Sequence, residues 1–192
     1  MKQRCGWAST ELDIVYHDTE WGIPLYDDDK LFEFLILEGA QAGLSWTTVL
    51  KKRAAYREAY LDFKPSIVSK FGQQKYQSLL ENTGLIRNKL KIQSSIKNAQ
   101  AFLNIQQEFG SFADYLWQFV DHKTIINHWQ TLDQIPSETP LSQTVSKELK
   151  KRGFNFVGPT ICYALMQATG LVNDHLISCP RHHEVQATLN NS

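Results

Sequence analysis

The sequence lacks the features that mark several large classes of protein. Its 192 residues contain three cysteines, a small and odd number that fits reduced or metal-bound thiols better than a disulfide framework. The longest apolar stretch, from Leu31 to Ala42, is short and contains Glu33 and Glu38, so no membrane span is expected. The first residues carry charge with no apolar run behind them, which argues against a secretory signal and leaves the cytoplasm as the expected compartment.

An excess of charge of one sign is also absent. Twenty Lys and Arg residues balance twenty Asp and Glu residues, and this neutrality weighs mildly against a nucleic-acid-binding protein. The basic residues are nevertheless clustered at 51–53, 87–91 and 147–152. Any one of these clusters fits a solvated helix face, so the charge distribution leaves DNA binding open.

Hydrophobic residues, which make up 42% of the chain, are spaced as in helices almost throughout. The chain is long enough to bury a substantial core, and it contains no repeats. Spacing and capping residues predict an all-α fold with helices at 27–39 or 27–43, 45–64, 65–71, 73–82, 88–103, 111–119, 142–152 and 159–169. Gly84 is expected to end one helix as a left-handed cap, 130–140 is expected to be a loop, and the polar tail after Pro180 is expected to fray.

The segment from Leu149 to Ala168 has the pattern of a helix, a short glycine-bounded hairpin and a second helix, with Val157 as the apolar plug between the helices. Such a hairpin directs backbone N–H groups and the positive end of the second helix outward, where they can hold a DNA phosphate without reading sequence. The pattern alone fits an ordinary helical hairpin equally well, because any such hairpin needs a glycine.

Further motifs occur in order along the chain: Arg4-Cys5-Gly6-Trp7, Tyr16-His17-Asp18, Glu20-Trp21-Gly22, Leu37-Glu38-Gly39, Gln41-Ala42-Gly43-Leu44-Ser45-Trp46 and Asn173-Asp174-His175. Thr83-Gly84-Leu85-Ile86-Arg87 precedes the long helix, and Phe154 to Cys162 supplies the hairpin. Together these segments resemble the DNA-3-methyladenine glycosylase I family of helix-hairpin-helix DNA glycosylases. The match covers residues 4 to 179.

The resemblance implies an all-α helix-hairpin-helix bundle that forms one glycosylase unit over 1–192. Its expected parts are a helical core at about 27–170, terminal segments 1–26 and 171–180 joined by a structural zinc ion, and a polar tail at 181–192. It also implies a bacterial monomer, associated with the nucleoid when it acts, that excises 3-methyladenine from duplex DNA by base flipping and hydrolysis. A base methylated at N3 is positively charged, so its glycosidic bond is already weakened and the enzyme works mainly by extruding and selecting the nucleotide.

Two positions in and after the hairpin bear on the mechanism. Bifunctional relatives carry a lysine nucleophile where this chain has Thr160, so no lyase step is expected. The aspartate that most of the superfamily uses is replaced by Asn173, whose amide cannot act as a general base. The adjacent Asp174 is interpreted as a partner of the neighbouring metal ligand.

Glu38 is the expected catalytic and base-recognition residue. It lies on an apolar stripe with Leu31 and Phe34, where a carboxylate is costly without a partner and burial favours its neutral form. The residues alone favour a structural acid that caps the turn at Gly39. The resemblance favours a carboxylate that accepts hydrogen bonds from the damaged adenine.

Aromatic residues are expected to enclose the base. Tyr16 and Trp46 are the stacking candidates, with Trp7 and Trp21 behind them, although a single tryptophan is more often part of a core. Asp13 stands where the family is expected to have an aromatic residue. Leu44 is expected to wedge into the gap left by the extruded nucleotide, and the DNA contacts are assigned to Leu44, Gly43, Phe156, Gly158 and Thr160.

Candidate metal ligands stand in pairs near the two ends of the sequence, Cys5 with His17 and His175 with Cys179. The second pair is spaced four apart, as on one face of a helical turn, and the resemblance implies that all four residues bind one structural zinc ion in a closed site. His182 and His183 are the alternative candidates for the fourth position. A DNA-binding module without catalysis and a zinc hydrolase with an open metal position stay as alternative functions.

Overall fold

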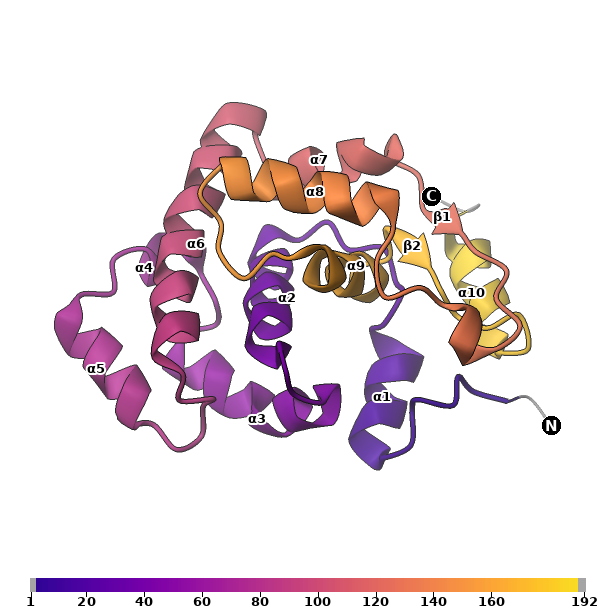
Figure 1. Ribbon diagram of the computed structural model, residues 1–192, viewed down its shortest axis with the longest axis horizontal. Coiled ribbons are helices and arrows are strands. Elements are labelled where there is room, and N and C mark those ends of the chain that lie inside the picture. Colours follow the sequence, from indigo (N-terminus) through magenta and orange to yellow (C-terminus); the bar gives the residue numbers. More distant parts are fainter. Residues whose placement is uncertain (1–2, 190–192) are drawn as a thin grey trace.

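The computed structural model describes residues 3–189, and nearly all of its regular structure is helical (Figure 1). In chain order its elements are α1 (Glu11–Thr19), α2 (Asp28–Gln41), α3 (Trp46–Ala59), α4 (Pro65–Val68), α5 (Gln73–Glu81), α6 (Lys89–Phe109), α7 (Phe112–Trp117), η1 (Gln118–Val120), β1 (Ile125–Ile126), η2 (Leu132–Gln134), α8 (Pro140–Lys151), α9 (Pro159–Ala168), β2 (Val172–Asn173) and α10 (Pro180–Leu189). Among the described helices, none is both long and apolar enough to cross a membrane.

Side-chain caps place the starts of the long helices where the sequence predicts them. The Asp27 carboxylate accepts a hydrogen bond from a backbone N–H in the first turn of α2 at 2.9 Å, and the Ser45 hydroxyl does the same for α3 at 3.3 Å. Asn88 caps α6 in the same way. These predicted helices are therefore confirmed, and their starts are fixed by residues close in sequence.

α2 runs through the middle of the molecule, with α3, α6, α7 and α9 packed around it (Figure 1). All of its residues from 31 to 40 are buried, including Glu33 and Glu38. The ring centre of Phe32 lies 5.2 Å from that of Phe102 on α6, which in turn lies 4.1 Å from that of Phe112 on α7. Burial on all sides explains why the residues from 31 to 40 are apolar or glycine apart from these two glutamates.

The end of α5 differs from the prediction. Asn82 follows the helix with an ordinary φ of −70°, and Gly84 does not adopt a left-handed conformation. A Cβ atom at Gly84 would lie only 2.8 Å from the Cβ of Ala55. The glycine is therefore needed for close packing of this loop against α3, and the predicted helix cap is wrong.

Two features of the fold are not predicted by the sequence. α1 begins after Thr10, which forms a capping box with Asp13, but its buried residues include the polar Asp13 and His17, so an apolar stripe is missing. The strands β1 and β2 pair in parallel, with Ile125 opposite Val172. Each strand has two residues, which is too short to show the alternation of apolar and polar residues that predicts a strand.

The C-terminal segment forms α10, so the predicted fraying after Pro180 is wrong for residues 181–189. His182 and Val185 are buried, and the carbonyl oxygen of His182 accepts a hydrogen bond from the side-chain amide of Asn173 at 3.0 Å. This contact ties the start of α10 to β2. The last part of the predicted tail, 190–192, lies outside the described residues.

Candidate functional site

A cleft of about 400 Å³ is lined by α1, α2, α3, α9 and three further segments, which lie before α1, after α1 and at η2. Its lining brings together all five residues that the sequence assigns to the base, Trp7, Tyr16, Trp21, Glu38 and Trp46. Five further residues line it without having been predicted, Gln41, Leu132, Ile135, Ala164 and Gln167. Helical spacing could have indicated Gln41, which follows Glu38 by three positions. Leu132 and Ile135 lie in the segment expected to be a loop, where no periodic signal exists.

Glu38 is a buried acid without a partner. The residue is 3% exposed, and its Oε2 atom receives no hydrogen bond from any described residue. Burial raises the pKa of Glu38 to about 8, so its carboxyl group is largely neutral at pH 7. An unpaired buried carboxyl is costly, and a ligand that supplies the missing hydrogen bonds would remove that cost. The arrangement therefore favours a binding role over a structural acid.

Aromatic rings from separate elements form a wall of the cleft. The ring centres of Tyr16 on α1 and Trp46 on α3 lie 5.3 Å apart at an interplanar angle of 46°. Burial, reinforced by the neighbouring Glu38, raises the pKa of Tyr16 well above its usual value, so its hydroxyl stays neutral. The indole N–H of Trp46 is also buried without a described acceptor. This wall presents flat faces together with unused hydrogen-bonding groups.

Trp7 and Trp21 connect this wall to the candidate metal site. Their ring centres lie 5.0 Å apart, and the ring centre of Trp21 lies 4.6 Å from that of His175 in an edge-on contact. Trp7 similarly packs edge-on to His17 at 5.3 Å. Both tryptophans therefore touch a candidate metal ligand and line the cleft at the same time.

Asp13 does not line the cleft. Its buried carboxylate accepts hydrogen bonds from the hydroxyl groups of Thr10 at 2.7 Å and of Thr47 at 2.9 Å. Burial by itself would raise the pKa of Asp13, but these hydrogen bonds lower it below its usual value. Asp13 thus links α1 to the first turn of α3 close to Trp46. Its contact is structural, whereas the aromatic residue expected at this position would have offered a stacking surface.

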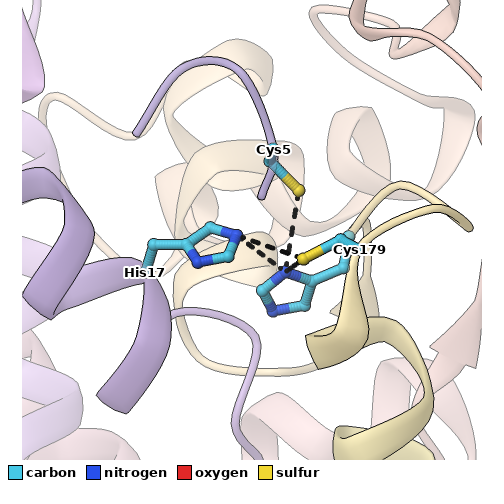
Figure 2. A group of neighbouring side chains, drawn as sticks. Cys5, His17 and Cys179 are labelled. Carbon is cyan, nitrogen blue, oxygen red and sulfur yellow. Dashed lines mark hydrogen bonds between the residues drawn. The ribbon is translucent and has the colours of Figure 1, made fainter. Parts of the chain in front are cut away.

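Cys5, His17, His175 and Cys179 converge, as the sequence predicts. Their ligand atoms all lie within 4.8 Å of one another and all four residues are buried, and Figure 2 shows Cys5, His17 and Cys179 pointing toward one another. His17 Nε2 lies 3.2 Å from His175 Nδ1 and 3.6 Å from Cys179 Sγ. Tetrahedral zinc with thiolate and imidazole ligands requires separations of about 3.3–3.8 Å between ligand atoms. The four residues therefore lie close enough together to hold a metal ion.

One detail of the metal-site prediction is wrong, and the two alternative ligands do not belong to the cluster. His175 and Cys179 flank a turn between β2 and α10 and do not share a helix. His182, a proposed competitor, lies outside the cluster because its Nε2 atom is 2.7 Å from the carbonyl oxygen of Asn127. His183 is not in the cluster either.

The carboxylate beside the metal ligands is Asp18, and the prediction of Asp174 for this role is wrong. Asp18 Oδ1 lies 2.8 Å from Nδ1 of His17, and an ion pair with Arg4 lowers the pKa of Asp18. Asp174 instead accepts four side-chain hydrogen bonds that connect β2 to α9 and to the segment after β1, from Asn127, Trp129, Tyr163 and Gln167.

The predicted hairpin lies between α8 and α9. Val157 is buried as predicted, and its carbonyl oxygen accepts a hydrogen bond from Ser146 on α8 at 2.6 Å. Phe156 adopts a left-handed φ of 55°, and Gly158 precedes Pro159, the first residue of α9. Thr160 is exposed. The first turn of α9 is therefore accessible, which anion binding at a helix start requires.

The turn between α2 and α3 is the second exposed element beside the cleft. Gly43 has a φ of 80°, which favours glycine, and no described atom would contact a Cβ there. Leu44 follows with 42% of its surface exposed. The structure thus places the predicted wedge residue on a tight, exposed turn.

Comparison with known proteins gives one consistent family. The family model for methyladenine glycosylase matches residues 7–182. DNA-3-methyladenine glycosylase 1 of Escherichia coli K12 is 50% identical over 92% of this chain and 95% of its own. A crystal structure of 3-methyladenine DNA glycosylase I has a TM-score of 0.90 and 52% identity, covering 93% of this chain and 98% of that chain. The Staphylococcus aureus 3-methyladenine DNA glycosylase I, solved for its recognition of 3-methyladenine, has a TM-score of 0.87 and 36% identity over 90% of this chain and 92% of its own. The chain therefore belongs to the methyladenine glycosylase family.

Proposed function

We propose that the cleft excises 3-methyladenine from alkylated duplex DNA, and that Glu38 recognises the base against the aromatic wall formed by Tyr16 and Trp46. The observation that carries this proposal is the buried, unpartnered carboxyl of Glu38 in a cleft with an aromatic wall. A bound base that donates hydrogen bonds to this carboxyl would satisfy a group that the protein leaves unsatisfied.

The charge of the damaged base explains how the cleft selects it. Adenine methylated at N3 carries a positive charge in DNA, and a cation near Glu38 favours the ionised carboxylate that burial alone disfavours. Tyr16 and Trp46 add cation-π attraction for the same charge. Undamaged adenine is neutral, so it gains neither contribution. Selection thus rests on charge as well as on shape.

Cleavage then requires little chemistry from the protein. Water adds to C1′ of the deoxyribose, the glycosidic bond breaks, and its electron pair leaves with the base, which becomes neutral. The added water gives up one proton, and an abasic site remains. Thr160 supplies no amine for a Schiff base, and Asn173 is fully buried in structural hydrogen bonds. The first feature supports a glycosylase without lyase activity, and the second supports cleavage without a general base at position 173.

The DNA contacts follow from the two exposed elements beside the cleft. In this proposal the hairpin residues Phe156, Gly158 and Thr160 hold a phosphate at the start of α9, and Leu44 fills the space of the extruded nucleotide from the turn at Gly43.

Zinc is the metal that the ligand set favours. Two thiolates and two imidazoles at tetrahedral spacing suit Zn²⁺, and four protein ligands leave no position for a reactive water. Bound zinc would supply folding energy by joining the segments 1–26 and 171–180 to the helical core at 27–170, with 1–192 as one unit. Without an open position, a zinc hydrolase is not supported.

Release of free base from methylated DNA tests the function. The protein is incubated with DNA treated with dimethyl sulfate, and released bases are separated by chromatography. We expect 3-methyladenine to be released by the wild type and at least ten-fold less by Glu38→Gln, since the neutral amide cannot pair with the cation. No release by the wild type would favour a non-catalytic DNA-binding module. Full release by Glu38→Gln would remove the role of Glu38 alone.

A further inference from the structure

The turn that joins α2 to α3 combines parts of the cleft and of the proposed DNA contact. Glu38 lies one helical turn before the end of α2, Leu44 projects from the turn, and Trp46 begins α3. A shift of this turn would therefore move the proposed wedge and the ends of two helices that line the cleft.

The end of α2 has few interactions of its own. Its last turn contains no basic residue, and Ala42, which follows the helix, has a non-helical ψ of 114°. The carbonyl oxygen of Gln41 accepts a hydrogen bond from the backbone N–H of Leu44 at 2.6 Å. Carbonyl groups at a helix end carry partial negative charge and are stabilised by a nearby cation.

Lys91 of α6 supplies this cation from outside the helix. Its Nζ atom donates hydrogen bonds to the carbonyl oxygens of Ala40 at 2.9 Å and of Ala42 at 2.6 Å. The neighbouring Lys89 and Leu90 are exposed, whereas Lys91 is half-buried, and burial lowers the pKa of Lys91. The side chain is thus directed into the protein, away from a solvated helix face.

The same helix also holds the hairpin. Asn98, two helical turns after Lys91, donates a hydrogen bond from Nδ2 to the carbonyl oxygen of Asn155 at 2.9 Å and accepts one from its backbone N–H at 2.8 Å. A Cβ built on Gly39 would lie 3.4 Å from the Cβ of Phe156, so the hairpin also contacts α2 directly. Figure 1 shows α6 beside both α2 and the connection from α8 to α9. α6 therefore fixes the turn and the hairpin relative to each other.

We propose that Lys91 is a positioning residue that holds the turn at Gly43 and Leu44 in place while the duplex is opened. The inference rests on the proposed role of Leu44 as a wedge. A wedge must resist the stacked bases that it separates. Without the contacts of Lys91, the helix end before this exposed turn has few interactions, and the stacked bases would displace the turn. Two charge-assisted hydrogen bonds to carbonyls on either side of the last residue of α2 oppose that displacement.

The experiment compares Lys91→Met, Lys91→Arg and Lys89→Met. Lys89→Met is the matched control, because it removes the same charge two residues away on the exposed side of α6. DNA is first methylated as a duplex, and one half is then denatured in cold formamide, because heating would release the labile methylated bases. Both substrates therefore contain the same lesions. Single-turnover release of 3-methyladenine is measured on each. Thermal unfolding and binding of free 3-methyladenine are measured on every variant.

We expect Lys91→Met to release base about ten-fold more slowly than the wild type from the duplex, and within two-fold of it from denatured DNA, where no stack has to be opened. Binding of free 3-methyladenine should stay within two-fold. Lys91→Arg should recover most of the loss on the duplex, because a guanidinium can reach both carbonyls. Lys89→Met should retain the wild-type ratio of the two rates.

Several results would overturn the proposal. One is an equal loss on both substrates, which would place Lys91 in general stability of the site. Another is the same duplex-specific loss in Lys89→Met and Lys91→Met, which would mark a simple charge contact with DNA. If Lys91→Met does not fold, Lys91→Arg still tests the proposal. The proposal requires Lys91→Arg to release base from the duplex at a rate that matches the wild type. Absence of base release by the wild type would instead defeat the proposed function itself.

Discussion

Two glutamates on α2 have opposite environments although both are buried. Glu33 is paired with Arg53 at 2.6 Å and Arg57 at 2.8 Å, so its charge is compensated within the protein. Glu38, five residues later, forms no ion pair with any described residue, and its Oε2 atom receives no hydrogen bond from them. In the sequence both residues are acids within one apolar run. Only the family resemblance identified Glu38 as the one expected to recognise the base. The distinction depends on which residues of α3 approach, and local sequence does not encode that.

The buried carboxyl of Glu38 predicts how stability changes with pH. Its pKa is about 8 in the folded protein and near 4.5 when exposed, so between these values the folded state holds a proton that the unfolded state has lost. The contribution of this group to the free energy of unfolding is fully present below pH 4.5 and decreases by about 1.4 kcal/mol per pH unit until about pH 8. Glu38→Gln, which does not titrate, should therefore become more stable relative to the wild type over this range.

Urea unfolding of both proteins at pH 5, 6.5 and 8 measures this difference. Taking the difference between variant and wild type cancels the titration of all other groups that the two proteins share. A difference that stays constant from pH 5 to pH 8 would mean that Glu38 is ionised in the free cleft.

At the scale of secondary structure, the sequence predicts elements that are stabilised locally and misses those stabilised from afar. α2 and α6 have capping residues and continuous apolar spacing, and both lie where expected. α1 buries Asp13 and His17, whose partners come from α3 and from the C-terminal segment. The turn at 175–179 is likewise set by convergence of the four candidate ligands, so the four-residue spacing suggested a helix that does not form.

The contact between α1 and α3 can be tested at Thr47. Thr47→Val keeps the shape of the side chain but removes the hydroxyl that donates to Asp13, leaving a buried carboxylate with fewer hydrogen bonds. We expect the free energy of unfolding to fall by about 1–2 kcal/mol. Because Tyr16 lies on α1 and Trp46 begins α3, affinity for free 3-methyladenine should fall as well, as measured by tryptophan fluorescence.

Thr47→Ser retains the hydroxyl and serves as the control for this change. It should keep the stability of the wild type to within a few tenths of a kcal/mol plus the small cost of the lost methyl group. A Thr47→Val protein with wild-type stability and base affinity would show that the Asp13 contact does not hold the aromatic wall.

At the scale of the whole molecule, the metal cluster joins parts of the chain that helix packing leaves apart. Cys5 and His17 come from the N-terminal segment and α1, while His175 and Cys179 follow β2. The cluster also contacts Trp7 and Trp21, which line the cleft. The family resemblance predicted this convergence correctly, whereas composition and spacing alone gave only two separate pairs. A distant pairing of this kind is visible in sequence only when the whole ligand set is recognised together.

Metal removal should therefore act on stability and on the cleft together. A strong chelator, or Cys179→Ala, is expected to lower the thermal midpoint by several degrees, because binding free energy at a structural zinc site is folding free energy. Release of 3-methyladenine should decline in parallel as the wall carrying Tyr16 loosens, and added zinc should restore both properties in the chelated protein. Metal content measured by mass spectrometry should fall from one zinc per chain to none in Cys179→Ala. Cys162→Ala removes a buried thiol on α9 outside the cluster and should retain the metal. If chelation abolished base release while the thermal midpoint stayed constant, the metal would be acting in the chemical step, and the structural role proposed for the closed site would be wrong.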